Sequence, residues 1–113
     1  GLPFISAGTD SAPHPEHSKV SGTGCAAGIF TAPYALEFYA QVFAEEGKLE
    51  QLEYFASRNG PRFYDLLPNR ETVTLVKQPL LPGVIPPHIK IHGSNDNIHL
   101  FGSGQKLQWS IAT

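Results

Sequence analysis

The sequence predicts an α/β fold, and three features along the chain carry this prediction. An apolar run without alternation, Leu2–Ala7, has the character of a short strand buried on both faces of a parallel sheet. Residues 31–67 then show apolar side chains at helical spacing. After Pro68 the pattern changes to short runs of strand-forming residues. With 113 residues, the chain has room for one domain with one modest core.

Two helices are expected between the first strand and Pro68. The first begins after Thr31, a residue type that caps helices, has Pro33 in its first turn and ends at Gly47. The second runs from about Leu49 to Arg58, and Asn59-Gly60-Pro61 is expected to end it. The apolar side chains of the first helix recur at helical spacing at Ala35, Leu36, Tyr39, Val42 and Phe43.

The last third of the chain is expected to form strands. Glu71–Lys77 places its side chains alternately on two faces, which predicts a partly exposed strand. Gln78–His88 is too rich in proline to join a central sheet. Two later runs flank Gly102-Ser103-Gly104, so we expect Asn97–Phe101 and Lys106–Ile111 to pair as a β-hairpin.

Composition excludes several classes of protein. The chain is 41% hydrophobic and 16% charged, too apolar for a disordered protein, and no apolar run is long enough to cross a bilayer. A net charge of -2 and singly scattered basic residues argue against a nucleic-acid partner. The only cysteine, Cys25, excludes a disulfide within the chain, fits a reducing compartment and is expected to be a small buried thiol. A start at Gly1 without any methionine indicates processing or a piece of a longer polypeptide.

The stretch GTDSAPHPEHSK, from Gly8 to Lys19, follows the expected buried strand and combines an aspartate, two histidines and a lysine with two prolines. Charged groups at the end of a buried strand are costly unless water, a metal or a substrate compensates them. From the pattern alone, Asp10 could equally be a turn or capping aspartate, and His14 a solvent-exposed loop residue. Residues 22–27 satisfy the dinucleotide fingerprint G-x-G-x-x-A, which we reject because no buried strand precedes them directly.

Several motifs resemble the C-terminal part of the bacterial-type, single-function dihydroorotases of the amidohydrolase superfamily. They are Gly8-Thr9-Asp10-Ser11-Ala12-Pro13-His14, Lys19, Gly24-Cys25-Ala26, Ala32-Pro33, Asn59-Gly60-Pro61-Arg62-Phe63-Tyr64 and Gly104-Gln105-Lys106-Leu107-Gln108-Trp109. The resemblance implies the C-terminal part of a (β/α)₈ barrel, a fold of about 250 residues with active sites at the C-terminal ends of its strands. On this reading residues 1–30 hold the last barrel strand and active-site loop, 31–67 the outer helices, and 68–113 a C-terminal extension with the hairpin.

The resemblance also implies a reaction and three functional residues. Asp10 matches the aspartate that ligates one of two zinc ions and shuttles a proton, while His14 and the backbone N–H of Ala26 match groups that hold the substrate carboxylate. The implied reaction is the reversible, zinc-dependent cyclisation of N-carbamoyl-L-aspartate to dihydroorotate, in pyrimidine biosynthesis, by a cytoplasmic enzyme expected to be a homodimer when complete. The other metal ligands have no counterpart here, so we expect the isolated chain to be inactive.

Alternatives stay open at this point. The chain could be a non-catalytic remnant or a binding module of the same fold, or part of another cyclic-amide hydrolase that shares Asp10 but lacks the pairing of His14 and Ala26 with a carboxylate. His17 is expected on the surface or supporting the site, because the neighbouring prolines argue against a helical turn that would make it a metal ligand with His14. Lys19 could pair with Asp10, with a substrate or with water. The remaining histidines, His88, His92 and His99, are expected on the surface or in the hairpin.

Overall fold

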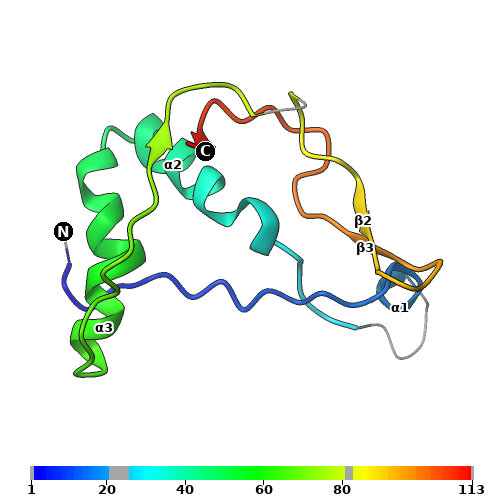
Figure 1. Ribbon diagram of the computed structural model, residues 1–113, viewed down its shortest axis with the longest axis horizontal. Coiled ribbons are helices and arrows are strands. Elements are labelled where there is room, and N and C mark those ends of the chain that lie inside the picture. The colour runs from blue at the N-terminus through cyan, green and yellow to red at the C-terminus, as the bar shows by residue number, and fades with distance from the viewer. Residues whose placement is uncertain (1, 21–25, 81–82, 113) are drawn as a thin grey trace. The chain divides into compact units, whose positions relative to one another are not determined.

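A computed structural model describes residues 2–20, 26–80 and 83–112 of the chain (Figure 1). These residues form two compact units. The first, here called the helical unit, combines residues 1–8, 36–78 and 108–113, and the second, the loop unit, combines residues 9–35 and 79–107. Cys25 and most of the rejected dinucleotide motif, residues 22–25 of 22–27, lie outside the described residues. Within the described ranges, no helix is both long and apolar enough to cross a membrane.

The first predicted helix is confirmed. A 3-10 turn, η1 (Ala32–Tyr34), leads into α2 (Ala35–Glu45). The chain leaves the helix at Gly47, whose φ of +65° lies in the left-handed region that glycine tolerates. The backbone N–H of Lys48 closes the end by donating to the Phe43 carbonyl at 2.7 Å. The prediction of Thr31 as the capping side chain is wrong, because its hydroxyl makes no cap hydrogen bond.

The second helical stretch continues through the proposed stop. It begins as a 3-10 turn, η2 (Leu49–Gln51), becomes a π-helix, η3 (Tyr54–Arg58), and ends as α3 (Asn59–Phe63). The prediction that Asn59-Gly60-Pro61 ends the helix is therefore wrong. A proline ring normally clashes with the carbonyl four residues earlier, and the wider π-turn, in which the Asn59 N–H donates to the Tyr54 carbonyl, is the local change that accommodates Pro61.

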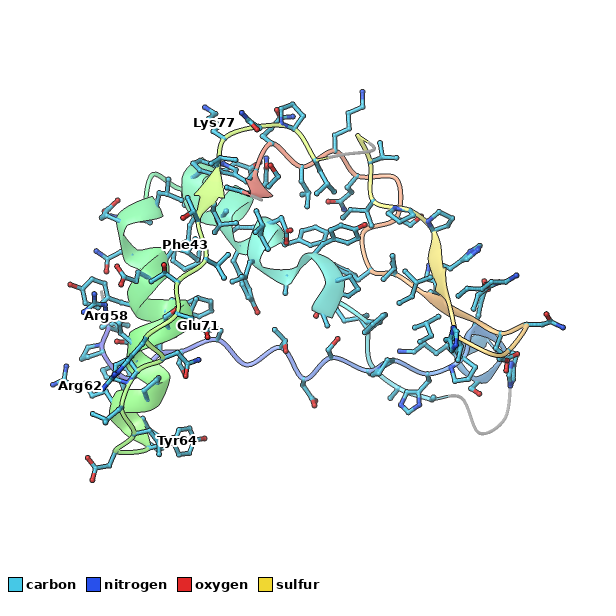
Figure 2. All side chains as sticks on the ribbon, in the orientation of Figure 1. Phe43, Arg58, Arg62, Tyr64, Glu71 and Lys77 are labelled. Carbon is cyan, nitrogen blue, oxygen red and sulfur yellow. The ribbon has the colours of Figure 1, made fainter. Side chains whose placement is uncertain are left out.

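Aromatic side chains hold α2 against this second helical stretch. The ring of Phe55 packs edge-on to Tyr39 and in a tilted arrangement with Phe43, both at a centroid distance of 5.2 Å. Ala40 and Leu52 are buried in the same unit. Figure 2 shows Phe43 on α2, Arg58 at the end of η3, Arg62 on α3 and Tyr64 just after it. The predicted apolar stripe on α2 is therefore confirmed only in part: Tyr39 and Phe43 pack on Phe55, Val42 is 52% exposed, and the buried residues of α2 are Glu37 and Ala40.

The strands are shorter than predicted and pair differently. In the helical unit, β1 (Leu75–Val76) pairs antiparallel with β4 (Ser110–Ile111). In the loop unit, β2 (His88–Lys90) pairs antiparallel with β3 (Asn97–His99), with His88 opposite His99. The predicted hairpin between residues 97–101 and 106–111 is therefore wrong.

Apolar burial in the loop unit accounts for the different pairing. Ile85, Leu100 and Leu107 are at most 2% exposed, and Leu80 is 5% exposed. The Leu80 N–H donates to the Leu107 carbonyl, and Ile85 exchanges backbone hydrogen bonds with Gln105 and Gly104. Because residues 104–107 thus bond to the proline-rich stretch, they are not available to residues 97–101.

The first predicted strand is not formed. Leu2, Phe4 and Ile5, expected to be buried, are 56%, 73% and 46% exposed. The segment is attached to the helical unit at two points: the Ala7 N–H donates to the Phe55 carbonyl at 2.9 Å, and the buried Asn59 amide donates to the carbonyls of residues 2 and 5. A strand needs a hydrogen-bonded neighbour. Within residues 2–20, 26–80 and 83–112 no strand pairs with this segment, and no barrel is formed.

Candidate active-site loop

Asp10 lies in the loop unit on an exposed stretch of backbone. Its φ of +42° is in the left-handed region, which among the described non-glycine residues is shared only with Asp65. Aspartate tolerates this region better than most residues, but the conformation is still sparsely populated. No hydrogen bond or ion pair of its carboxylate is recorded within the described ranges. The side chain is therefore presented to its surroundings rather than used to cap the turn.

His14 lies four residues further along, on an exposed site between two prolines. Its backbone N–H donates to the Ala12 carbonyl at 3.0 Å, which closes a three-residue turn centred on Pro13. On the other side, Pro15 forms an isolated antiparallel bridge with Ile98 of β3. The fixed φ of Pro13 favours this turn. The backbone that carries the imidazole is thus held on both sides.

Ala26 lies on the returning stretch of the same loop. Its backbone N–H donates to the Ser18 carbonyl at 2.7 Å. Ser18 belongs to α1 (Glu16–Val20), a short helix within the stretch assigned above to the active-site loop. Pro15 directly precedes α1, a position at which the missing proline N–H does no harm. For Ala26 to hold a substrate carboxylate, this backbone hydrogen bond would have to be exchanged for one to the substrate.

The stretches around Asp10 and after Ala26 are hydrogen-bonded side by side (Figure 1). The Ala12 N–H donates to the Ile29 carbonyl at 2.9 Å. The Ser11 hydroxyl oxygen accepts from the backbone N–H groups of Thr31 and Ala32, both at 3.0 Å. Ser11, rather than Thr31, therefore supplies the cap of this helical start. Composition gave no signal for this role, since the capping residue lies twenty positions earlier in the chain.

Lys19 and His17, two further ionisable residues of this stretch, both have structural partners. The Lys19 ammonium donates to the Gly28 carbonyl at 2.7 Å, so this lysine ties α1 to the returning stretch. The imidazole Nδ1 of His17 is 3.6 Å from a carboxylate oxygen of Asp96, in an exposed position where an ion pair is weak. Figure 1 shows α1 beside β2 and β3.

The described residues do not form a metal site by themselves. In the part of the chain that the structure describes, no group of three or more histidine, cysteine, aspartate or glutamate side chains converges. A zinc site needs three or four protein ligands. Asp10 has the right chemistry for one ligand, and the rest of a coordination sphere would have to come from elsewhere.

Comparisons with known proteins find similarity to dihydroorotases. No protein-family profile matches the chain. Curated proteins named dihydroorotase are similar over nearly its whole length: 48% identity over 111 residues for Erythrobacter litoralis, 46% over 112 for Halorhodospira halophila and 48% over 104 for Yersinia pestis. These matches cover 98%, 98% and 92% of this chain. The chain spans only about 30% of the length of these relatives.

Solved structures agree with the sequence comparison. The dihydroorotase of Saccharomyces cerevisiae in complex with 5-fluoroorotic acid is 35% identical, with a TM-score of 0.86 over 98% of this chain and 30% of that one. The dihydroorotase of Campylobacter jejuni is 28% identical, with a TM-score of 0.77 over 99% of this chain and 30% of that one. The resemblance expected from the motifs is confirmed.

Proposed function

We propose that this chain, a homologue of the C-terminal part of dihydroorotases, completes the active site of such an enzyme. The reaction is the reversible interconversion of N-carbamoyl-L-aspartate and dihydroorotate in pyrimidine biosynthesis. The observation that carries the proposal is 48% identity over 98% of the chain, including the loop that presents Asp10 and His14. Because the chain spans 30% of its relatives, the remaining residues of the site belong to the rest of the complete polypeptide.

In this proposal Asp10 transfers a proton when the ring of dihydroorotate is hydrolysed. The water oxygen bonds to the ring carbonyl carbon, a carboxylate oxygen of Asp10 takes the proton, and the proton passes to the ring nitrogen as the C–N bond breaks. The exposed position of Asp10 and its lack of a recorded partner within the described ranges support this role. Zinc, bound chiefly by residues outside this chain with Asp10 as one ligand, would lower the pKa of the water.

His14 and Ala26 are proposed to bind the substrate carboxylate. An imidazole N–H and a backbone N–H are both suitable donors to an anion. His14 is supported by its exposure and by the turn and bridge that fix its backbone, since a pre-ordered donor loses less entropy when it binds. Ala26 is supported by its position just before the stretch that bonds to residues 11 and 12, and its role requires release of the hydrogen bond to Ser18.

The complete enzyme is proposed to be a cytoplasmic homodimer on a (β/α)₈ barrel with two zinc ions. Exposed apolar side chains of the unpaired N-terminal segment support the placement of that segment within a larger barrel, where neighbouring strands would cover it. The likeness to solved dihydroorotases supports the same placement.

A replacement experiment tests the proposed function. For this test we define the completed enzyme as the Yersinia pestis dihydroorotase in which this chain replaces the homologous stretch. We expect it to restore growth without added pyrimidine in a bacterial strain that lacks dihydroorotase, and to hydrolyse dihydroorotate when purified. A folded, zinc-loaded protein with no turnover would support a non-catalytic remnant instead.

A further inference from the structure

One side chain clamps the backbone that follows Asp10 to the start of the 3-10 turn η1. The Ser11 hydroxyl oxygen accepts two backbone hydrogen bonds at 3.0 Å, from Thr31 and from Ala32. Thr31 is the N-cap residue of η1 and Ala32 is its first residue, and N–H groups at this end have no partner within the helix. A third bond, from the Ala12 N–H to the Ile29 carbonyl, adds to the clamp.

Close contact at Gly28 strengthens the same clamp. Gly28 has a φ of +92°, and a Cβ atom placed there would lie 2.7 Å from the Cβ of Ala12. Its carbonyl also accepts the hydrogen bond from Lys19. The stretch at residues 11–12 therefore lies directly against the stretch at residues 28–32.

The side chain of Asp10 makes no hydrogen bond within the described ranges that would hold the residue in place. Asp10 has a left-handed backbone and an exposed side chain. A residue in a sparsely populated conformation keeps it only when the surrounding structure imposes it. The contacts nearest to Asp10 that can hold this backbone conformation are the two hydrogen bonds accepted by the hydroxyl of the next residue, Ser11.

We propose that Ser11 is a positioning residue that sets where the Asp10 carboxylate and the His14 imidazole stand in the completed active site. This inference rests on the proposed function for its catalytic consequence. Displacement of a reacting group by about 1 Å lowers rates on the order of 100-fold. Ser11 therefore affects turnover without touching the substrate.

The test uses three variants of the completed enzyme. Ser11→Ala removes the acceptor, Ser11→Thr keeps a hydroxyl, and Thr31→Val is the matched control. Thr31 has a buried hydroxyl without a recorded partner, and only its backbone N–H takes part in the clamp. Steady-state kinetics gives kcat and KM, and amide hydrogen exchange followed by mass spectrometry reports on residues 12, 31 and 32.

We expect Ser11→Ala to lower kcat about 10- to 100-fold, to raise KM and to speed exchange at the amides of residues 31 and 32. Ser11→Thr should recover most of kcat, and Thr31→Val should behave as wild type. Unchanged kcat in Ser11→Ala would overturn the inference. So would rapid exchange of both amides in the wild-type enzyme, even if Ser11→Ala did not fold.

The kinetic and exchange results separate this inference from the proposed function. If the completed enzyme has no activity but loses amide protection in Ser11→Ala, the clamp exists and the proposed function fails. If the enzyme is active, depends on Asp10 and tolerates Ser11→Ala, only the positioning role fails.

Discussion

Gly28 allows the most direct physical test of how the loop unit is built. Its φ of +92° lies in the left-handed region, and an added Cβ would approach the Ala12 Cβ to 2.7 Å, closer than side chains tolerate. In Gly28→Ala, the backbone conformation costs about 1–2 kcal/mol. The overlap adds about 1–3 kcal/mol, because both atoms are attached to backbone and neither can rotate away.

The matched control is Gly104→Ala. Gly104 has a similar φ of +83°, but a Cβ there would meet no atom within 4 Å. It should therefore lose only the backbone part, about 1–2 kcal/mol. Urea denaturation of the completed enzyme and the two variants measures both losses. Equal losses in the two variants would refute the close approach of Gly28 to Ala12.

Three further outcomes are expected. In Asn59→Asp, the donor to the carbonyls of Leu2 and Ile5 is lost and replaced by a buried charge, so the free energy of unfolding of the completed enzyme should fall by about 1–3 kcal/mol. A fall below about 0.5 kcal/mol, as for a surface substitution, would contradict the attachment of residues 2–5 through Asn59. Burial raises the pKa of the Glu37 carboxyl above 4.5, so the contribution of this group to stability is present below pH 4.5 and is lost as pH rises through the raised pKa. Glu37→Gln should therefore be more stable than wild type at neutral pH, by an amount that shrinks toward pH 4. A difference in urea midpoint that does not change with pH would speak against this. The purified 113-residue chain with zinc should show no turnover of dihydroorotate, and any rate above background would refute the need for residues outside the chain.

The sequence predicted the features that depend on local chemistry. The start of α2 near Pro33 and its end at Gly47 follow from backbone preferences of single residues, and both are found in the structure. Continuation through Pro61 was missed because it depends on a π-helical register, and such a register has no signature in apolar spacing. The strand pairings were missed because burial of Ile85 and Leu107 in one core decided which segments met.

The candidate site shows the same division. The presence of Asp10 and His14 on one polar loop could be predicted from the motif, and so could the absence of a helical turn joining His14 to His17. The capping role of Ser11 could not, because it depends on two stretches twenty residues apart meeting in space. Lys19, for which three partners were open, donates to a backbone carbonyl that no pattern marks.

The proposed role of Asp10 is tested most directly by Asp10→Asn in the completed enzyme, with turnover of dihydroorotate and bound zinc measured on the same sample. The amide keeps the size of the side chain but can neither take up a proton from water nor carry charge. We expect turnover to fall by at least about 10³-fold, as for loss of an essential acid–base group, while the melting curve stays within the range of a surface substitution. An Asp10→Asn enzyme with a near-wild-type rate would contradict the account.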